Sequence, residues 1–129
     1  MEANELRIGN YVYNDYLKKN KQINGIFNNE IWLSEIGEDE FDQRSVIDSI
    51  NPIPITEDWL LKFGFRATIS NKDSGYKQFG LRECKFDFMF TLECNGNPEF
   101  FLENVGLDIL YVHQLQNLYF SLTEKELTV

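Results

Sequence analysis

The chain is poor in the residues that build metal and covalent catalytic centres, with two cysteines and one histidine among 129 residues. A single imidazole excludes sites that need a pair of histidines, and no Cys-x-x-Cys pair is present. P-loop, dinucleotide-binding and Gly-x-Ser-x-Gly motifs are also missing. The sequence therefore predicts no cofactor, no metal and no catalytic residues. A small hydrolase ranks third among the functions considered.

The two cysteines, Cys84 and Cys94, lie in a stretch whose pattern predicts one strand. Ten residues of strand span about 33 Å at ~3.3 Å per residue. A disulfide requires Cα atoms within about 7 Å, so these two residues cannot pair on an unbroken strand. We expect two free, buried thiols, as suits a reducing compartment.

Basic residues are scarce as well: 12 of them face 21 acidic residues, and the net charge is −9. Nucleic acid and anionic membranes bind basic surfaces, so neither is an expected partner. No apolar run approaches the ~20 residues that cross a bilayer, and the acidic start does not resemble a signal peptide. A cytoplasmic protein is predicted. Its acidity serves solubility or, alternatively, mimics nucleic acid.

A short central helix is the strongest local signal in the chain. Pro52 and Pro54 favour an extended approach, and Thr56 is a good N-cap. Gly64 ends the helix after roughly two turns. So short a helix requires tertiary packing, for which Trp59 is the main expected anchor.

Four extended segments with tight turns precede this helix, at residues 6–13, 22–27, 30–36 and 45–55. Asn28-Asn29 suits a two-residue hairpin turn, because asparagine tolerates positive φ. The segments predict an SH3-like small β-barrel half over residues 1–55. The acidic loop 37–44 lacks the ligand spacing of an EF-hand and is predicted to be solvated.

The second half predicts an antiparallel sheet and a C-terminal helix. Its clearest pattern is strict alternation over residues 84–94, with apolar residues at every second position. Residues 112–122 instead show helical spacing. The predicted fold class is α+β, with the C-terminal helix packed against the second sheet. Residues 1–129 are predicted to form a single compact domain whose halves, 1–55 and 56–129, share a core.

An aromatic face is the candidate binding site. If residues 6–13 form one strand, its aliphatic side chains point inwards and Arg7, Tyr11 and Tyr13 point outwards. Trp32, out of phase with its apolar neighbours, joins them. Such residues are favoured interface anchors, and they also stack nucleobases or bind phosphate. Alternatively, the rings cover the second half of the fold or join two copies of the chain.

His113 is the one imidazole, near the predicted start of the C-terminal helix. We expect it to cap that helix or to be partly buried. Ligand binding is the alternative role.

Three stretches resemble a group of small proteins encoded by Bacteroidota genomes and by the phages or mobile elements within them: Glu5–Val12, Pro52–Phe65 and Tyr111–Phe120. The resemblance implies an accessory protein of a mobile element and brings no catalytic motif. We predict a non-enzymatic protein that binds and occupies a host protein, as a counter-defence factor would. The alternative is a protein that sequesters a small anionic ligand such as a nucleotide signal, which the net charge disfavours.

Overall fold

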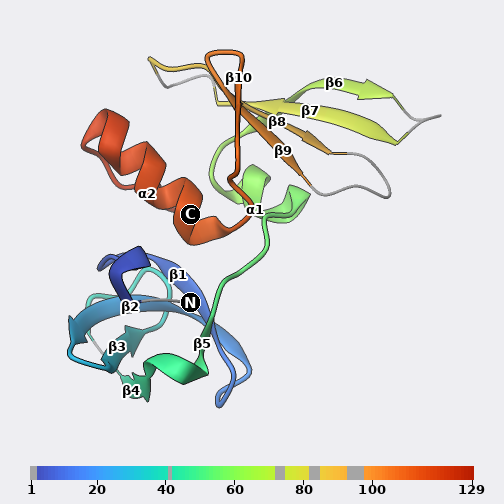
Figure 1. Cartoon of the computed structure of the whole chain (residues 1–129). Helices are drawn as coiled ribbons and strands as arrows, with labels where there is room; N and C mark the ends of the chain where they lie inside the picture. The colour runs from blue at the N-terminus through green and yellow to red at the C-terminus, as the bar shows by residue number, and fades with distance from the viewer. Residues whose placement is uncertain (1–2, 41, 72–74, 82–84, 93–97) are drawn as a thin grey trace. The chain divides into compact units, whose positions relative to one another are not determined.

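The computed structural model describes residues 3–40, 42–71, 75–81, 85–92 and 98–129. Its described residues form two five-stranded antiparallel sheets and two α-helices, which confirms the α+β class (Figure 1). The chain divides into two compact units. The first comprises Met1–Pro54 and Tyr111–Leu127, and the second comprises Ile55–Leu110 and Thr128–Val129. The prediction of a single domain with a shared core stays a prediction.

The sheet of the first unit is the curled half-barrel that the short segments predict. Its strand order is β4-β3-β2-β1-β5, with every neighbouring pair antiparallel. Asn28 has a φ of +54° in the turn of the β2–β3 hairpin, so the predicted turn is confirmed. The buried core contains Leu6, Val12, Ile23, Ile31, Leu33 and Ile50. The strands are β1 (Tyr11–Asn14), β2 (Lys19–Phe27), β3 (Glu30–Ser34), β4 (Gln43–Val46) and β5 (Ile50–Asn51), and two 3-10 turns, η1 (Ala3–Glu5) and η2 (Ile47–Ser49), flank them.

The predicted first strand, residues 6–13, is wrong in its first half. Ile8 and Gly9 form a turn, and Gly9 adopts a φ of +98°. The backbone N–H of Arg7 donates to Asn10 Oδ1 at 2.7 Å, which closes this turn. The strand begins only at Tyr11, so the alternation assumed from residue 6 does not exist. The fourth segment is also interrupted, because η2 separates β4 from β5.

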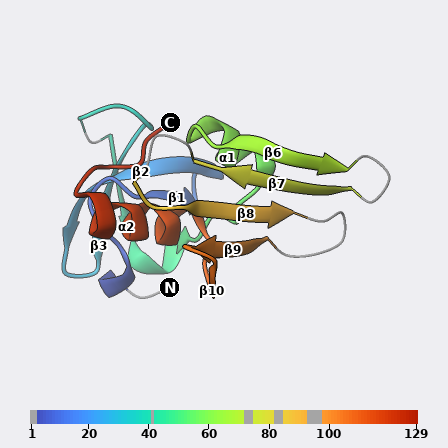
Figure 2. The same ribbon diagram turned by 90° about the horizontal axis from the view of Figure 1, so that it is seen from above.

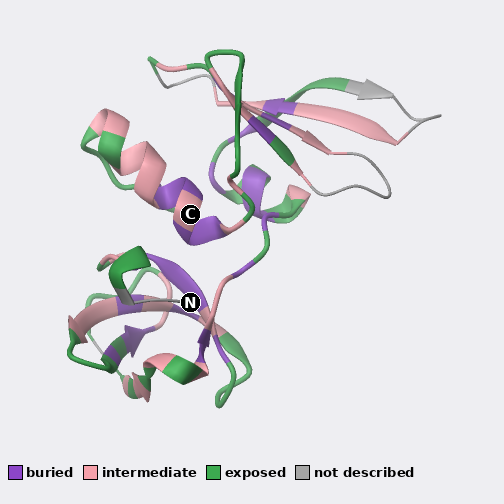
Figure 3. Cartoon of the chain, viewed as in Figure 1, coloured by how far each residue is buried: buried purple, intermediate pink, exposed green. Residues whose placement is uncertain are grey.

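The C-terminal helix α2 (Val112–Thr123) forms where its spacing predicts. The prediction placed it against the second sheet, but its hydrogen bonds assign it to the first unit. The N–H of Tyr11 donates to Gln116 Oε1 at 2.8 Å, and Gln116 Nε2 donates to the carbonyls of Gly9 and Leu127 at 3.1 and 3.2 Å. The first two turns of α2 bury His113 and Gln116 together with apolar residues (Figure 3).

The second unit begins with the predicted short helix, α1 (Glu57–Lys62). Thr56 Oγ1 accepts the N–H of Trp59 at 3.4 Å, and Gly64 has a φ of +96°. Both capping predictions are therefore confirmed. Five strands follow in the order β10-β9-β8-β7-β6, and Figure 2 shows β6 to β9 side by side. These strands are β6 (Arg66–Asn71), β7 (Tyr76–Gly80), β8 (Phe88–Leu92), β9 (Glu99–Leu102) and β10 (Val105–Leu107).

A cluster of phenylalanines forms the core of the second sheet, at positions 65, 79, 88, 90 and 100. The predicted strand over residues 84–94 is shorter in the structure, where it covers Phe88–Leu92, because Lys85 to Asp87 lie outside it. Within it the alternation holds from Phe88 to Thr91: Phe88 and Phe90 are buried, whereas Met89 and Thr91 are half-buried. Leu92, which the alternation places on the buried face, is also only half-buried. Cys84 and Cys94 lie outside the described residues, so the free-thiol prediction is untested.

Candidate interaction surface

An apolar groove of about 400 Å³ lies on the outer face of the first unit. Its walls come from the turn before β1 and from the β2–β3 hairpin. Exposed apolar side chains are common singly, but a contiguous group of them marks an interaction site. We call this feature the Trp32 groove; it is lined by Ile8, Gly25, Ile26, Phe27 and Trp32.

Glycine at position 25 makes room for the indole ring of Trp32. The two residues are cross-strand partners, and a Cβ on Gly25 would lie 3.3 Å from Trp32 Cε3. A register shift between Ile23 and Gly25 marks an irregularity in β2 beside this pair. Because Ile31 and Leu33 are fully buried, Trp32 between them faces outwards.

The groove presents large apolar side chains to solvent. Ile8 is 61% exposed, Phe27 66% and Trp32 37%. Two charged residues stand beside it: Arg44 is the β4 partner of Trp32, and Glu30 is the partner of both Phe27 and Val46. The arrangement can hold an apolar side chain, and the described residues that line it include no nucleophile and no acid–base pair.

Of the four predicted site residues, only Trp32 lines this groove. Arg7 pairs with Glu126, donates to Asn117 Oδ1 at 3.0 Å and lies 4.0 Å from the ring centroid of Phe120. These contacts direct its guanidinium to α2 and the segment that follows it.

The two tyrosines do not join the groove either. Tyr11 is 2% exposed, so its predicted place on an outer face is wrong. Tyr13 is half-buried on β1, between β2 and β5. The predicted alternation does not hold because β1 starts at Tyr11, five residues later than the predicted strand. Ile8 and Phe27 were missed; the Gly9-Asn10 dipeptide was the available signal for the turn that exposes Ile8.

A buried lysine anchors the acidic loop on the same unit. Lys21 is buried, and its Nζ donates to both oxygens of Asp42 at 2.8 and 2.9 Å and to Glu35 at 3.0 Å. Burial opposes the charge of Lys21, but the hydrogen bonds with Asp42 and Glu35 outweigh it and raise its pKa above the ordinary 10.5. Hydrogen bonds from Lys19 and Lys21 lower the pKa of Glu35. The loop is thus held in place rather than merely solvated.

His113 is buried, and neither ring nitrogen has a hydrogen-bond partner among the described residues. Its ring stacks on that of Tyr111, and Nε2 lies 3.9 Å from Glu5 Oε2. Capping at this end comes instead from Gln114, whose Oε1 accepts the N–H of Tyr111 at 3.1 Å. Burial lowers the pKa of His113 below its ordinary 6.5, and the charge of Glu5 opposes this only in part.

Because His113 is buried, we expect the free energy of unfolding to fall in mild acid. Because its pKa is lowered in the folded state, the unfolded chain binds the proton more readily. The stabilisation is complete above about pH 6.5 and is lost as the pH falls through the folded pKa, by ~1.4 kcal/mol per unit of difference. His113→Leu should therefore flatten the dependence of unfolding free energy on pH between 7 and 5. Urea unfolding at several pH values measures this, and equal slopes for the two proteins would contradict it.

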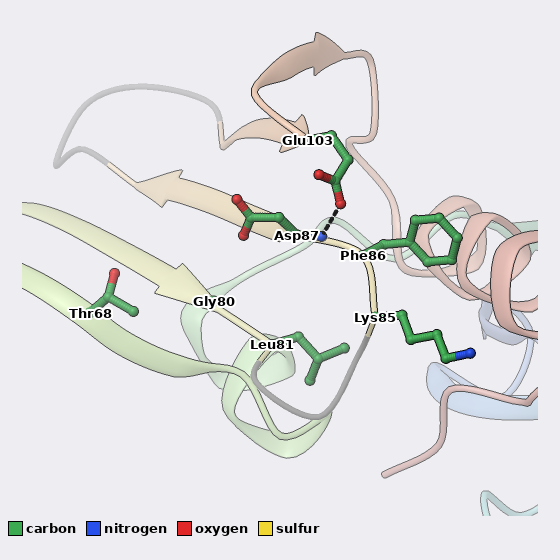
Figure 4. A pocket seen from close by; sticks show the side chains of 7 residues that line it. All are labelled: Thr68, Gly80, Leu81, Lys85, Phe86, Asp87 and Glu103. Carbon is green, nitrogen blue, oxygen red and sulfur yellow. Dashed lines mark hydrogen bonds between the residues drawn. The ribbon is translucent and has the colours of Figure 1, made fainter.

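A second hollow, in the second unit, has polar residues but no convergent chemistry (Figure 4). A carboxylate oxygen of Glu103 accepts the N–H of Asp87 at 2.6 Å. In Figure 4 the side chains of Thr68, Lys85 and Asp87 point in different directions. A catalytic site requires a nucleophile within hydrogen-bond reach of its base, and these side chains do not provide that arrangement.

Comparisons with protein-family models, with curated proteins and with solved structures find no match for this chain. Among the described helices, none is long and apolar enough to cross a membrane. The described residues also contain no group of three His, Cys, Asp or Glu side chains that could hold a metal ion.

Proposed function

We propose that the protein is a non-enzymatic binding protein that occupies a partner protein by accepting one of its apolar side chains in the Trp32 groove. The observation that carries this proposal is the clustering of exposed Ile8, Phe27 and Trp32 around the Trp32 groove. Tryptophan dominates binding energy at many interfaces because it buries a large area at little entropic cost. The resemblance to accessory proteins of mobile elements favours a protein of the host as the partner.

Charge pairing disfavours the alternative, a small anionic ligand. Lys19 and Lys21 are bound to Glu35, Lys77 to Glu57, and Arg7 to Glu126. An anion would have to displace these carboxylates against the field of a chain with a net charge of −9. A panel of nucleotides in a thermal-shift assay tests this alternative, since a ligand at 100 times its Kd stabilises by ~2.7 kcal/mol.

A random peptide library displayed on phage tests the proposal and does not require the partner to be identified first. The wild-type protein should enrich a consensus with an aromatic or large aliphatic residue. Trp32→Ala should weaken binding of that consensus by about 30-fold, the equivalent of ~2 kcal/mol for an interface anchor. The matched control is Tyr16→Ala, which removes an aromatic ring that is 82% exposed outside the groove, and it should bind as the wild type does.

Two results would overturn this proposal. One is the absence of any consensus, or a consensus that Trp32→Ala retains. The other is a wild-type dimer in sedimentation that Trp32→Ala converts to monomer, because the groove would then hold a second copy of the chain. Trp32→Ala should cost no more than about 2 kcal/mol of stability, below the ~3–5 kcal/mol of a fully buried ring. Urea unfolding of the same variant checks that its fold survives.

A further inference from the structure

We infer that the partner segment is basic: lysine or arginine residues flank its apolar anchor and meet carboxylates at both ends of the Trp32 groove. This inference rests on the proposed function and adds the chemistry of the partner. Two acidic features carry it: Glu30 at the hairpin end, and the acidic segment 38–40, which is Glu38-Asp39-Glu40.

Hydrogen bonds hold the acidic segment 38–40 beside β2. Asn24 Nδ2 donates to the carbonyl of Asp39 at 2.7 Å, and Ser34 Oγ donates to the carbonyl of Glu38 at 3.0 Å. The N–H of Gly37 donates to Gln22 Oε1 at 2.9 Å. Asn24 directly precedes Gly25, which lines the groove. The segment therefore lies next to the groove, where hydrogen bonds from Asn24 and Ser34 hold its backbone.

The carboxylates of this segment are available to a partner. Lys19 forms an ion pair with Glu35, and Lys21 forms ion pairs with Glu35 and Asp42, which lie on either side of the acidic segment in the sequence. Glu38, Asp39 and Glu40 are exposed, and none forms an ion pair with another described residue. Main-chain groups, not side chains, fix the segment, so its charges remain solvated and free to bind cations.

The other end of the groove is acidic as well. Glu30 is exposed, is the cross-strand partner of Phe27, and is likewise outside the ion pairs of the described residues. Arg44, opposite Trp32, supplies one positive charge on the β4 side. Four carboxylates against one guanidinium leave the surroundings of the groove negative.

Charge complementarity selects among apolar partners. An apolar anchor supplies most of the affinity, while charges at the rim raise the association rate and repel like-charged competitors. The net charge of −9 adds a long-range field of the same sign. Such steering is screened by salt, with a Debye length of about 10 Å at 0.1 M.

Three fluorescein-labelled 12-residue peptides test the inference by fluorescence anisotropy. All share a central Leu-Phe anchor, and their flanks are Lys/Arg, Ser/Gln or Asp/Glu. The basic peptide should bind the wild type at least ~10-fold more tightly than the neutral one, and the acidic peptide most weakly. Raising the salt from about 50 to 500 mM should remove most of that difference.

Two triple variants separate local recognition from overall charge. E38Q/D39N/E40Q should bring the basic peptide within about threefold of the neutral one. D15N/E99Q/D108N removes the same three charges from exposed positions elsewhere and should keep the preference. Equal affinities of the basic and neutral peptides for the wild type, or equal losses in both variants, would overturn the inference. Basic-peptide binding that is indifferent to Trp32→Ala would also overturn it.

The same titrations distinguish the two failures. If the neutral peptide binds as well as the basic one and Trp32→Ala abolishes both, the inference fails and the proposed function stands. If Trp32→Ala leaves the binding of every peptide unchanged, the proposed function fails with it.

Discussion

Replacing Gln116 by leucine should lower the free energy of unfolding by roughly 3–5 kcal/mol. Gln116 is fully buried, and its amide bonds the N–H of Tyr11 and the carbonyls of Gly9 and Leu127. Leucine has a similar volume but cannot replace these bonds. Each buried polar group left without a partner costs about 1–3 kcal/mol, and burial of the leucine methyl groups offsets part of the total.

Urea unfolding followed by circular dichroism measures this loss. Ser121→Ala is the matched control, because Ser121 is exposed on the same helix and its replacement should change stability by about 0.5 kcal/mol or less. A loss below about 1 kcal/mol for Gln116→Leu would show that the Gln116 network does not hold α2 to the first unit.

Phe90→Ala should destabilise the chain by about 3–5 kcal/mol through its second unit. Phe90 is fully buried on β8, and its ring lies 4.7 Å from that of Phe100 and 5.7 Å from that of Phe65, measured between centroids. The substitution removes the ring on which these two pack, and the sheet can close the resulting cavity only in part. Aromatic pairs contribute a further ~0.5–1.5 kcal/mol each beyond the area they bury.

Differential scanning calorimetry of Phe90→Ala should show a lower transition temperature for the second unit. Thr91→Ala is the control on the neighbouring position of the same strand, where the side chain is half-buried, and it should cost about 1 kcal/mol or less. Similar losses for the two variants would mean that Phe90 is not at the centre of the second core.

The features that the sequence predicted best are those set by neighbouring residues, such as helix caps. Helix α1 begins and ends as predicted because Thr56 and Gly64 act on their own neighbours, whatever the rest of the fold does. The spacing of residues 112–122 also identified α2. It could not identify the packing partner of α2, because the contact with β1 is made by a buried amide, Gln116, that a pattern of apolar residues counts as solvent-facing.

The site shows how far an alternation argument extends. Trp32 was predicted to face outwards from its position between buried Ile31 and Leu33, and it does. Arg7 and Tyr11 were assigned by the same reasoning across residues 6–13, where the backbone turns at Gly9. Alternation predicts the facing of side chains only within an unbroken strand. A single residue with positive φ turns the backbone, so positions before and after it no longer alternate together.

The discontinuity of the first unit has a consequence for synthesis on the ribosome. Residues 1–54 leave the ribosome before Gln116 exists to accept the N–H of Tyr11. At ~5–20 residues per second, the roughly 60 residues between Pro54 and Gln116 take about 3–12 s to translate. During that interval the nascent first sheet lacks the helix that completes it. The described strands of the second unit pair only with strands next to them in the sequence, and such local pairings form fast. The second unit can therefore fold before the first sheet has α2 to pack against.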